Sequence, residues 1–431
     1  MAGGKGTRIA SVKSDVPKPM IEICGKPVLE YQIENLRECG LTDIILVIGH
    51  MGWKIKEYFG DGRRFGVQIS YFEEELPLGT AGALYQIPGL DDDFLLLCGD
   101  VMLSVDFNRF IAFHRQHHAW ASLMAHPNGH PYDSALLETE VLPPNVPGGL
   151  PVETSRVTRW INKEDSRTYY KNRVNAGIEI ISPLLLREAK KILVPRHPEQ
   201  PDRIDLDRDI LKPMVMRGHI YAYDTPEYIK DMGTPDRYAE VTADVQSGKV
   251  HARNLSCLQR AIFLDRDGTI NREKGFLNKV EDMELIQGAT DAIRMINRSE
   301  YLAVIITNQP VIARGECSFE ELQHIHERME TELGREGAYI DGLYVCPHHT
   351  DRGFDGERSD YKYECDCRKP KPGLLLQAAK DLNIDLSQSY VIGDSDRDTE
   401  AGRNAGCREC IKIEKNKDYA LAAAVKNILN Q

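Results

Sequence analysis

Two carboxylates end an apolar run in the second half of the chain. Residues 261–264 read Ala-Ile-Phe-Leu, which predicts a buried strand, and Asp265 and Asp267 follow one residue apart. Gly268 then allows the chain to turn away. Two carboxylates at a strand end repel each other unless a cation lies between them. Magnesium with a phosphoryl group would satisfy both acids, although the same residues are also compatible with a plain acidic turn.

Two further apolar runs, residues 301–306 and 390–393, also end in polar side chains. Hydroxyl and amide groups after the first run suit phosphoryl oxygens, and a carboxylate after the second suits a hard cation. Two cations that precede the last run would balance phosphate charge. The residues concerned are Thr307, Asn308 and Gln309, then Arg368 and Lys369, then Asp394.

Three cysteines and a histidine come in two tight pairs between these runs. Cys346 and His348 form the first pair, and Cys365 and Cys367 form the second. Three thiolates and one imidazole are the usual ligands of a closed structural zinc site. The alternatives are four unliganded side chains, or His349 as the ligand in place of His348.

These patterns together resemble the haloacid-dehalogenase (HAD) superfamily of phosphohydrolases, from about Ala261 to the end of the chain. The Thr-Asn-Gln run, the zinc loop and the Cys-Arg-Lys-Pro-Lys-Pro-Gly stretch from Cys367 are similar to D-glycero-D-manno-heptose 1,7-bisphosphate 7-phosphatases and the related histidinol phosphatases. This resemblance implies Asp265 as nucleophile and Asp267 as general acid and base. One departure is Pro310-Val311, where these enzymes often have Ser-Gly, which stiffens the loop.

The same resemblance implies roles for the other candidates. Magnesium would be held by Asp265, Asp394 and the backbone carbonyl of Asp267. The phosphoryl group would be stabilised by Thr307, Asn308 and Lys369, the substrate would be contacted by Gln309, Arg314 and Arg368, and zinc would be bound by Cys346, His348, Cys365 and Cys367.

A glycine-rich stretch opens the chain and carries several cations. Glycines allow backbone amides to approach a triphosphate, and lysine and arginine neutralise it. The spacing from Ala-Gly-Gly-Lys-Gly-Thr-Arg to Pro-Lys-Pro-Met resembles the signature of the sugar-phosphate nucleotidyltransferases, a Rossmann-like family. That resemblance implies that nucleoside triphosphate and sugar phosphate are bound by Gly3, Gly4, Gly6, Thr7, Arg8, Lys18, Gly79, Thr80, Lys163, Asn175 and Gly177, with magnesium on Asp100 and Asp231.

Two departures from this second family concern the sugar site and the sheet. Asn162-Lys163 stands where the family has Glu-Lys, which leaves the sugar undetermined. The family also begins with an apolar strand before Ala-Gly-Gly, and here Met1 stands where that strand would end. We expect that the numbering starts at an internal Met, and the alternative is a degraded domain kept for binding or assembly.

The length, composition and net charge of the chain are typical of a globular protein of the cell interior. At 431 residues it is long enough for two or three domains, and its net charge of -12 argues against a general binder of nucleic acid or anionic membrane. We find neither a signal peptide nor an apolar run of membrane-spanning length. Ten cysteines, four of them assigned to zinc, favour a reducing cytoplasm over a disulfide scaffold. A homo-oligomer is left open.

Strands that alternate with helices predict an α/β protein of two Rossmann-like domains with mainly parallel sheets. We assign residues 1–245 to a transferase domain, 246–259 to a linker and 260–431 to a HAD phosphatase domain without a cap. The two reactions are consecutive if the phosphatase removes the 7-phosphate of a heptose bisphosphate and the transferase then joins the 1-phosphate to GTP. The alternatives are a histidinol-phosphate or other sugar phosphatase fused to a mannose 1-phosphate guanylyltransferase, or to a non-catalytic nucleotide-sugar-binding module.

Overall fold

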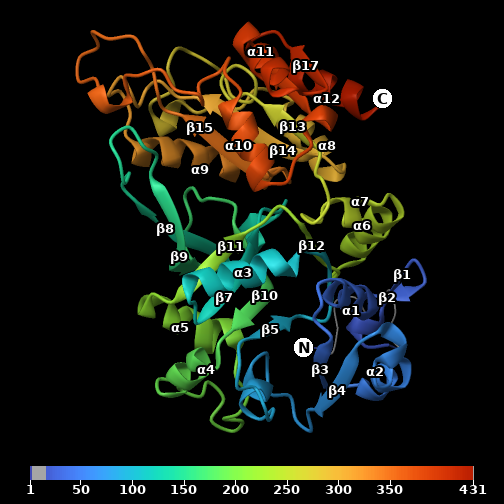
Figure 1. The fold of residues 1–431 in the computed structure, drawn as a ribbon. Coiled ribbons are helices and arrows are strands. Elements are labelled where there is room, and N and C mark those ends of the chain that lie inside the picture. The colour runs from blue at the N-terminus through green and yellow to red at the C-terminus, as the bar shows by residue number, and fades with distance from the viewer. Residues whose placement is uncertain (2–15, 431) are drawn as a thin grey trace. The chain divides into compact units, whose positions relative to one another are not determined.

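The computed structural model describes residue 1 and residues 16–430, which form two compact units (Figure 1). The first unit contains Met1–Ala125, Ser155–Trp160 and Asn175–Asn254. The second contains His126–Thr154, Ile161–Val174 and Leu255–Gln431. The α/β class is therefore confirmed, but the chain passes between the units several times instead of once.

A five-stranded parallel sheet forms the centre of the second unit. Its order is β15-β14-β13-β16-β17, so the strand that carries Asp265 is central. The strands are β13 (Ala261–Leu264), β14 (Leu302–Asn308), β15 (Gly342–Cys346), β16 (Tyr390–Gly393) and β17 (Glu409–Lys412).

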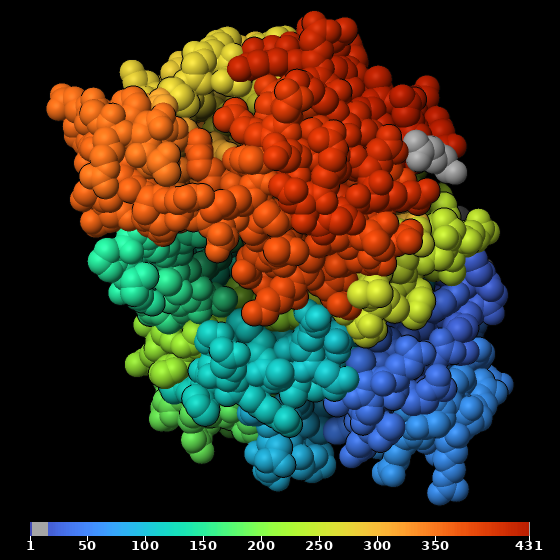
Figure 2. Space-filling model, turned by 45° about the horizontal axis from the view of Figure 1, so that its top comes forward, coloured from blue at the N-terminus to red at the C-terminus, as the bar shows by residue number. Residues whose placement is uncertain are grey.

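Helices cover both faces of this sheet, which explains why its strands read as unbroken apolar runs. Ile262 and Leu264 pack on one side against α8 (Ala289–Arg298), α9 (Phe319–Arg335) and α12 (Ala420–Leu429). Ala261 and Phe263 pack on the other side, against α10 (Gly373–Asp381) and α11 (Asp396–Ala405). The orange and red C-terminal segments form a continuous surface of this unit in the space-filling view (Figure 2).

The sheets in the first half of the chain have mixed strand directions. β3 (Asp43–Ile48) and β4 (Gln68–Glu73) form a parallel pair, and β6 (Val101–Ser104) and β12 (Tyr228–Asp231) form an antiparallel pair. A larger sheet has the order β5-β10-β7-β11-β9-β8, with strands β5 (Phe94–Leu97), β7 (Ala121–His126), β8 (Leu136–Leu142), β9 (Val152–Ile161), β10 (Val174–Ile181) and β11 (Ile220–Asp224).

The first half of the chain also contains two short strands, β1 (Glu22–Ile23) and β2 (Lys26–Pro27). Its helices are α1 (Val28–Glu38), α2 (Gly52–Phe59), α3 (Phe107–His117), α4 (Pro183–Lys190), α5 (Lys212–Met214), α6 (Pro235–Gln246) and α7 (Lys249–Ala252). The prediction of mainly parallel sheets therefore holds for the second unit, whereas antiparallel pairs join β5 to β10 and β9 to β11 in the first.

Met1 lies beside the end of β5. Its amino group donates to the carbonyl of Leu97, and its own carbonyl accepts from the amide of Gly99. Among the residues that the structure describes, β3 pairs only with β4, and no strand joins this pair to β5. In the part of the chain that the structure describes, the larger sheet and the β3–β4 pair are therefore separate sheets.

The predicted domain boundaries differ from the compact units in two places. The expected linker, 246–259, contains α7, and its Lys249 is buried 3.3 Å from the carboxylate of Asp244 within the first unit. Burial lowers the pKa of Lys249 to about 8. The boundary in the sequence falls between Asn254 and Leu255. The polar composition of residues 246–259 predicts a linker because it does not reveal this buried ion pair.

Two segments of the expected transferase domain belong to the second unit, and we call residues 126–154 and 161–174 the arm. The amide of Asn172 donates to Glu330 Oε2 at 2.8 Å, and the amide of Tyr170 donates to Thr331 Oγ1 at 2.9 Å. Both acceptors are buried on α9. The partners are more than 150 residues apart in the chain, so strand and helix patterns do not predict this contact.

Within the described residues, no helix is long and apolar enough to cross a membrane.

Candidate active sites

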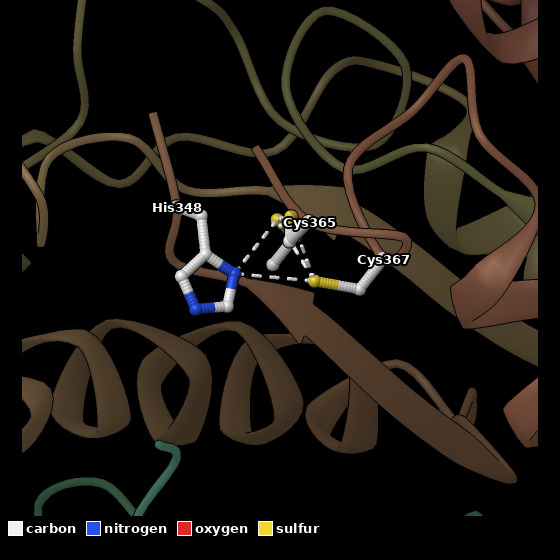
Figure 3. Close-up of side chains that lie close together, drawn as sticks. His348, Cys365 and Cys367 are labelled. Atoms are coloured by element: carbon white, nitrogen blue, oxygen red, sulfur yellow. Dashed lines mark hydrogen bonds between the residues drawn. The ribbon is translucent and has the colours of Figure 1, made fainter. Parts of the chain in front are cut away.

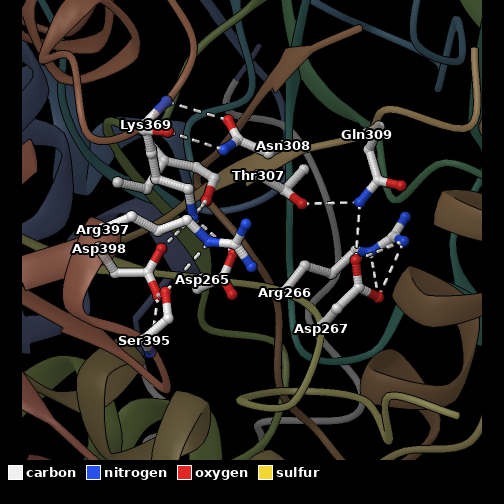
Figure 4. Close-up of polar contacts among 11 residues, drawn as sticks. Asp265, Arg266, Asp267, Thr307, Asn308, Gln309, Lys369, Ser395, Arg397 and Asp398 are labelled. Atoms are coloured by element: carbon white, nitrogen blue, oxygen red, sulfur yellow. Dashed lines mark hydrogen bonds and ion pairs between the residues drawn. The ribbon is translucent and has the colours of Figure 1, made fainter. Parts of the chain in front are cut away.

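A buried lysine connects two carboxylates at the carboxyl ends of the parallel strands. Lys369 Nζ lies 2.6 Å from Asp265 Oδ1 and 2.7 Å from Asp398 Oδ1, and it donates to the carbonyl of Ile306 at 2.9 Å (Figure 4). Asp265 follows β13, Ile306 lies on β14, and Asp398 is in the first turn of α11. Neighbouring parallel strands thus bring three distant segments to one point.

This arrangement gives the two carboxylates different acidities. Burial raises the pKa of Asp265 to about 7, the nearby Asp398 adds to the rise, and Lys369 opposes it. Burial would also raise the pKa of Asp398, but Lys369 outweighs this effect and lowers it. For Lys369, burial favours the neutral amine, yet the two carboxylates outweigh it and raise the pKa. Asp398 is therefore the standing counter-ion of Lys369, whereas burial raises the pKa of Asp265.

Asp267 is held by a separate set of donors. Arg266 donates to both of its carboxylate oxygens at 2.9 Å, Asn271 donates to Oδ1 at 2.9 Å, and Gln309 donates to Oδ2 at 2.8 Å. Gln309 also donates to Thr307 Oγ1 at 2.7 Å. Burial would raise the pKa of Asp267, but Arg266 and the amide donors outweigh it and lower the pKa. The side chain is therefore fixed as a carboxylate.

A third carboxylate approaches the turn that follows β13. A Cβ atom at Gly268 would lie 2.4 Å from Asp394 Oδ2, and Gly268 has a φ of +81°, so glycine is needed here for two reasons. One oxygen each of Asp265, Asp394 and Asp398 lie within 4.8 Å of one another. Such a cluster of oxygen donors suits a hard divalent cation.

The remaining phosphatase candidates differ in their position. Asn308 exchanges two hydrogen bonds with the backbone of Lys369, at 3.1 and 3.2 Å, so it positions the lysine. Arg368 donates to the carbonyl of His348 at 2.9 Å. The guanidinium of Arg314 lies between the rings of Phe276 and Phe354, 3.9 and 4.4 Å from their centroids.

The departure at Pro310-Val311 has a structural consequence. Val311 is fully buried and packs with Ile312, Cys317 and Tyr361. The loop after Gln309 is thus anchored in a small apolar cluster, in keeping with the expected stiffening.

The four expected zinc ligands converge at the end of β15. The three sulfur atoms are 3.2 to 3.6 Å apart, and His348 Nδ1 lies 3.3 Å from Cys367 Sγ and 3.7 Å from Cys346 Sγ (Figure 3). A tetrahedral ion with bonds of about 2.3 Å to sulfur requires sulfur atoms about 3.8 Å apart, so the donor set fits zinc after a small expansion. His349 is not part of the cluster, and its Nδ1 accepts from the amide of Asp351.

Three of the described transferase candidates, Lys18, Asp100 and Asp231, form partly exposed ion pairs. Lys18 Nζ lies 2.9 Å from Asp100 Oδ2. Arg237 donates to both oxygens of Asp231, at 2.9 and 2.7 Å. In the β12–β6 pair, Asp231 is opposite Val101, the neighbour of Asp100, so the two acids expected to hold magnesium lie at adjoining positions of one sheet.

Other transferase candidates lie in tight backbone contacts. A Cβ atom at Gly79 would lie 2.4 Å from the carbonyl oxygen of Ile204, and Thr80 Oγ1 accepts from the amide of Leu206 at 2.7 Å. Asn175 Oδ1 accepts from the amide of Gly177 at 3.4 Å.

The transferase candidates are divided between the two compact units. Lys163 is exposed and belongs to the second unit, while Lys18, Asp100, Asp231, Gly79, Thr80, Asn175 and Gly177 belong to the first. The predicted phosphate-loop residues Gly3, Gly4, Gly6, Thr7 and Arg8 lie outside the described residues.

Sequence reasoning overlooked three residues of the phosphatase site. Asp398 is the counter-ion of Lys369, and its position four residues after Asp394 was the available signal. Arg266, between the two acids, is fully buried and holds Asp267, while its NH1 lies 3.0 Å from His326 Nε2. Burial, together with the charge of Arg266, lowers the pKa of His326 to about 3, so this imidazole is neutral. No local pattern marks His326, because it contacts Arg266 only in the folded chain.

Comparison with known proteins supports the two family resemblances, one for each half of the chain. The family described as Nucleotidyl transferase matches residues 1–248, and the family described as HAD-hyrolase-like matches residues 366–411. A curated relative from Pasteurella multocida (strain Pm70), D-glycero-beta-D-manno-heptose-1,7-bisphosphate 7-phosphatase, is 40% identical over 160 residues, which are 37% of this chain and 84% of the relative. The relative of that name from Vibrio cholerae serotype O1 is 41% identical over 157 residues, 36% of this chain and 82% of its own length.

Among solved structures, the D,D-heptose 1.7-bisphosphate phosphatase from B. bronchiseptica, complexed with magnesium and phosphate, is 28% identical, with a TM-score of 0.35. The match covers 40% of this chain and 99% of that one.

The fold and the strand-end residues define a fusion of two phosphate-transferring enzymes, a nucleotidyltransferase followed by a HAD phosphatase. The chain belongs to the nucleotidyl transferase family and, through its C-terminal part, to the D-glycero-beta-D-manno-heptose-1,7-bisphosphate 7-phosphatase family.

Proposed function

We propose that the chain carries out two consecutive steps in the synthesis of a nucleotide-activated heptose. The C-terminal half removes the 7-phosphate of D-glycero-D-manno-heptose 1,7-bisphosphate. The N-terminal half then joins the resulting heptose 1-phosphate to a nucleoside triphosphate, with GTP as the expected donor, and releases pyrophosphate. The sequence similarity of the C-terminal half to heptose bisphosphate phosphatases, at 38–41% identity over at least 80% of their length, is the observation that carries this proposal.

In the first half-reaction, a carboxylate oxygen of Asp265 attacks the phosphorus atom of the 7-phosphate. The bond between phosphorus and the sugar oxygen breaks, and Asp267 gives that oxygen its proton. Lys369, 2.6 Å from Asp265, stabilises the charge that develops on the phosphoryl oxygens. In the second half-reaction Asp267 takes a proton from water, which attacks the aspartyl phosphate and releases inorganic phosphate.

The hydrogen-bond donors around Asp267 favour its carboxylate form, and this affects its role as general acid. Arg266, Asn271 and Gln309 hold its carboxylate and lower its pKa. Asp267 must therefore gain its proton after substrate enters and the phosphate charge opposes these cations. Thr307 and Gln309 share a hydrogen bond at 2.7 Å, so a phosphoryl group that engages Thr307 would also weaken the donor to Asp267.

Two kinds of metal ion fit the second unit. Magnesium would be held by Asp265, Asp394 and the backbone carbonyl of Asp267, and it would neutralise the phosphoryl oxygens. Zinc would be held by Cys346, His348, Cys365 and Cys367 in a closed structural site. The carboxylate cluster and the four converging donors support these assignments.

In the transferase half, the phosphate oxygen of heptose 1-phosphate attacks the α-phosphorus of the nucleotide, and the bond to pyrophosphate breaks. Lys18 would contact phosphate, and Asp100 and Asp231 would hold magnesium. The salt bridge between Lys18 and Asp100 and the one between Asp231 and Arg237 must open when nucleotide binds. A protein located in the cytoplasm would meet both substrates there.

Phosphate release from a panel of substrates tests the proposal. The full chain is supplied with Mg²⁺ and either anomer of the heptose 1,7-bisphosphate, or with histidinol phosphate. We expect preference for one bisphosphate anomer, and that anomer is then tested for pyrophosphate release with GTP and other nucleoside triphosphates. Preference for histidinol phosphate would overturn the heptose assignment.

A further inference from the structure

The arm places a backbone carbonyl beside the cysteine and histidine cluster. The carbonyl oxygen of Gly148 lies 2.9 Å from His348 Nε2, the ring nitrogen that points away from the sulfur atoms (Figure 3). Gly148 lies between β8 and β9, in the sequence half that matches the nucleotidyl transferase family. It belongs to the same compact unit as the cluster.

Two tyrosines hold the Gly148 loop at this position. Tyr361, which is buried, donates from its hydroxyl to the carbonyl of Gly149 at 2.8 Å. The hydroxyl of Tyr363 lies 2.7 Å from His348 Nε2 and donates to the Gly148 carbonyl at 3.4 Å. The imidazole of His348 is thus enclosed by Gly148 of the arm and by Tyr363, which lies in the loop between His348 and Cys365.

This contact determines which ring nitrogen of His348 carries the proton. A carbonyl oxygen only accepts hydrogen bonds, so the 2.9 Å contact requires a proton on Nε2. In the neutral imidazole, Nδ1 then has a free lone pair, and Nδ1 is the atom that faces Cys346 and Cys367. This is the tautomer that a metal ligand needs, and an acceptor on the other ring nitrogen is the usual way to fix it.

The close approach depends on the absence of a side chain at position 148. Gly148 has a φ of +74°, and a Cβ atom there would lie 2.4 Å from the backbone carbonyl of Asp360. Backbone atoms cannot move aside as a flexible side chain can. A side chain at this position would push the loop away from His348.

We propose that the arm is a positioning element of the phosphatase, and that the Gly148 carbonyl orients His348 for zinc. The half of the chain assigned to nucleotidyl transfer thereby supplies part of the outer surroundings of a metal site in the other half. This inference rests on the proposed zinc binding and adds to it the source of the second hydrogen bond of His348. Zinc retention should then depend on residues some 200 positions before the ligand.

The rate at which zinc passes from the full-length protein to a chromogenic chelator tests this dependence. Gly148→Ala is compared with Gly406→Ala, because Gly406 also has a positive φ, +82°, but its Cβ would meet nothing within 4 Å. Loss of an outer hydrogen bond to a metal-bound histidine costs about 10- to 100-fold in affinity. We expect release about 10-fold faster or more in Gly148→Ala and unchanged release in Gly406→Ala.

A milder pair of variants keeps the test valid if Gly148→Ala does not fold. Tyr361→Phe removes the hydroxyl that holds Gly149, and Tyr58→Phe removes a hydroxyl of the first unit that donates to Glu30 at 2.7 Å. Release several-fold faster in Tyr361→Phe alone supports the proposal.

Zinc bound at one equivalent, with equal release rates in the wild-type protein and in every variant that folds, overturns the positioning role only. Wild-type protein that binds no zinc overturns the zinc assignment as well.

Discussion

The two candidate sites hold their charges in different ways. In the second unit, the side chains of Lys369 and Asp398 are each 1% exposed, and Asp265 shares the same lysine. In the first unit, the side chains of Lys18 and Asp100 are 26% and 34% exposed. A buried charge must be paired continuously, whereas an exposed pair separates at little cost because water replaces the partner. The charges of the phosphatase site are therefore paired before substrate binds, whereas a ligand would separate the exposed pairs in the described part of the transferase site at little cost.

The largest expected effect is the loss of the proposed nucleophile. Asp265→Asn keeps the shape of the side chain but removes its nucleophilic carboxylate, so we expect phosphate release to fall at least about 1,000-fold. Release of pyrophosphate by the same variant should be unchanged, which provides the control. A variant that retained a tenth of the phosphatase rate would contradict the proposed role.

The second effect concerns the buried counter-ion. Asp398→Ala leaves Lys369 with one carboxylate and removes the hydrogen bonds to Ser395 at the start of α11, so we expect a loss of about 3 kcal/mol of stability. Urea denaturation of the second unit measures it. Asp396→Ala is the matched control, because Asp396 pairs with Lys412 but its side chain is 86% exposed. Equal shifts in both variants would refute the importance of burial.

The third effect is a pH dependence caused by His326. Its pKa is about 3 in the folded protein and about 6.5 in the unfolded chain, so the unfolded state binds the proton first as the pH falls. The stability due to the neutral imidazole is complete above pH 6.5 and decreases by about 1.4 kcal/mol per unit below it, down to pH 3. Between pH 7 and pH 5, we expect the free energy of unfolding of His326→Gln to fall by about 2 kcal/mol less than that of the wild-type protein. Urea denaturation at the two pH values measures this difference. Parallel losses in the two proteins would show that His326 is not responsible.

The smallest effect on stability is expected in the transferase half. Lys18→Ala breaks a half-exposed pair and should cost less than about 1 kcal/mol. Its pyrophosphate release should nevertheless fall at least about 10-fold, because a phosphate contact is lost. Lys26→Ala is the control, since Lys26 and Glu34 form a pair of similar exposure, at 32% and 30%. If both variants kept full activity, Lys18 would not contact the nucleotide.

Much of the phosphatase half could be predicted, because its polar site residues directly follow apolar runs in the sequence. Residues 261–264, 301–306 and 390–393 correspond closely to β13, β14 and β16, and parallel pairing necessarily brings their carboxyl ends together. The cysteine and histidine spacing likewise predicted the four converging donors. The compact units divide the chain differently from the predicted linker and first domain, because burial of Lys249 and the contacts of Asn172 are not local properties of the sequence.

The sequence by itself thus determined the order of the strands' polar ends, the identities of the four converging cysteine and histidine donors and the families of both halves. Only the tertiary structure decided that Asp398 completes the charge of Lys369, that His326 supports Arg266, and that Gly148 faces His348. The physical reason is the range of the interactions. Strand runs and ligand pairs depend on neighbours in the chain, whereas the pairing of a buried charge or the tautomer of a histidine depends on groups that come together only when distant segments pack.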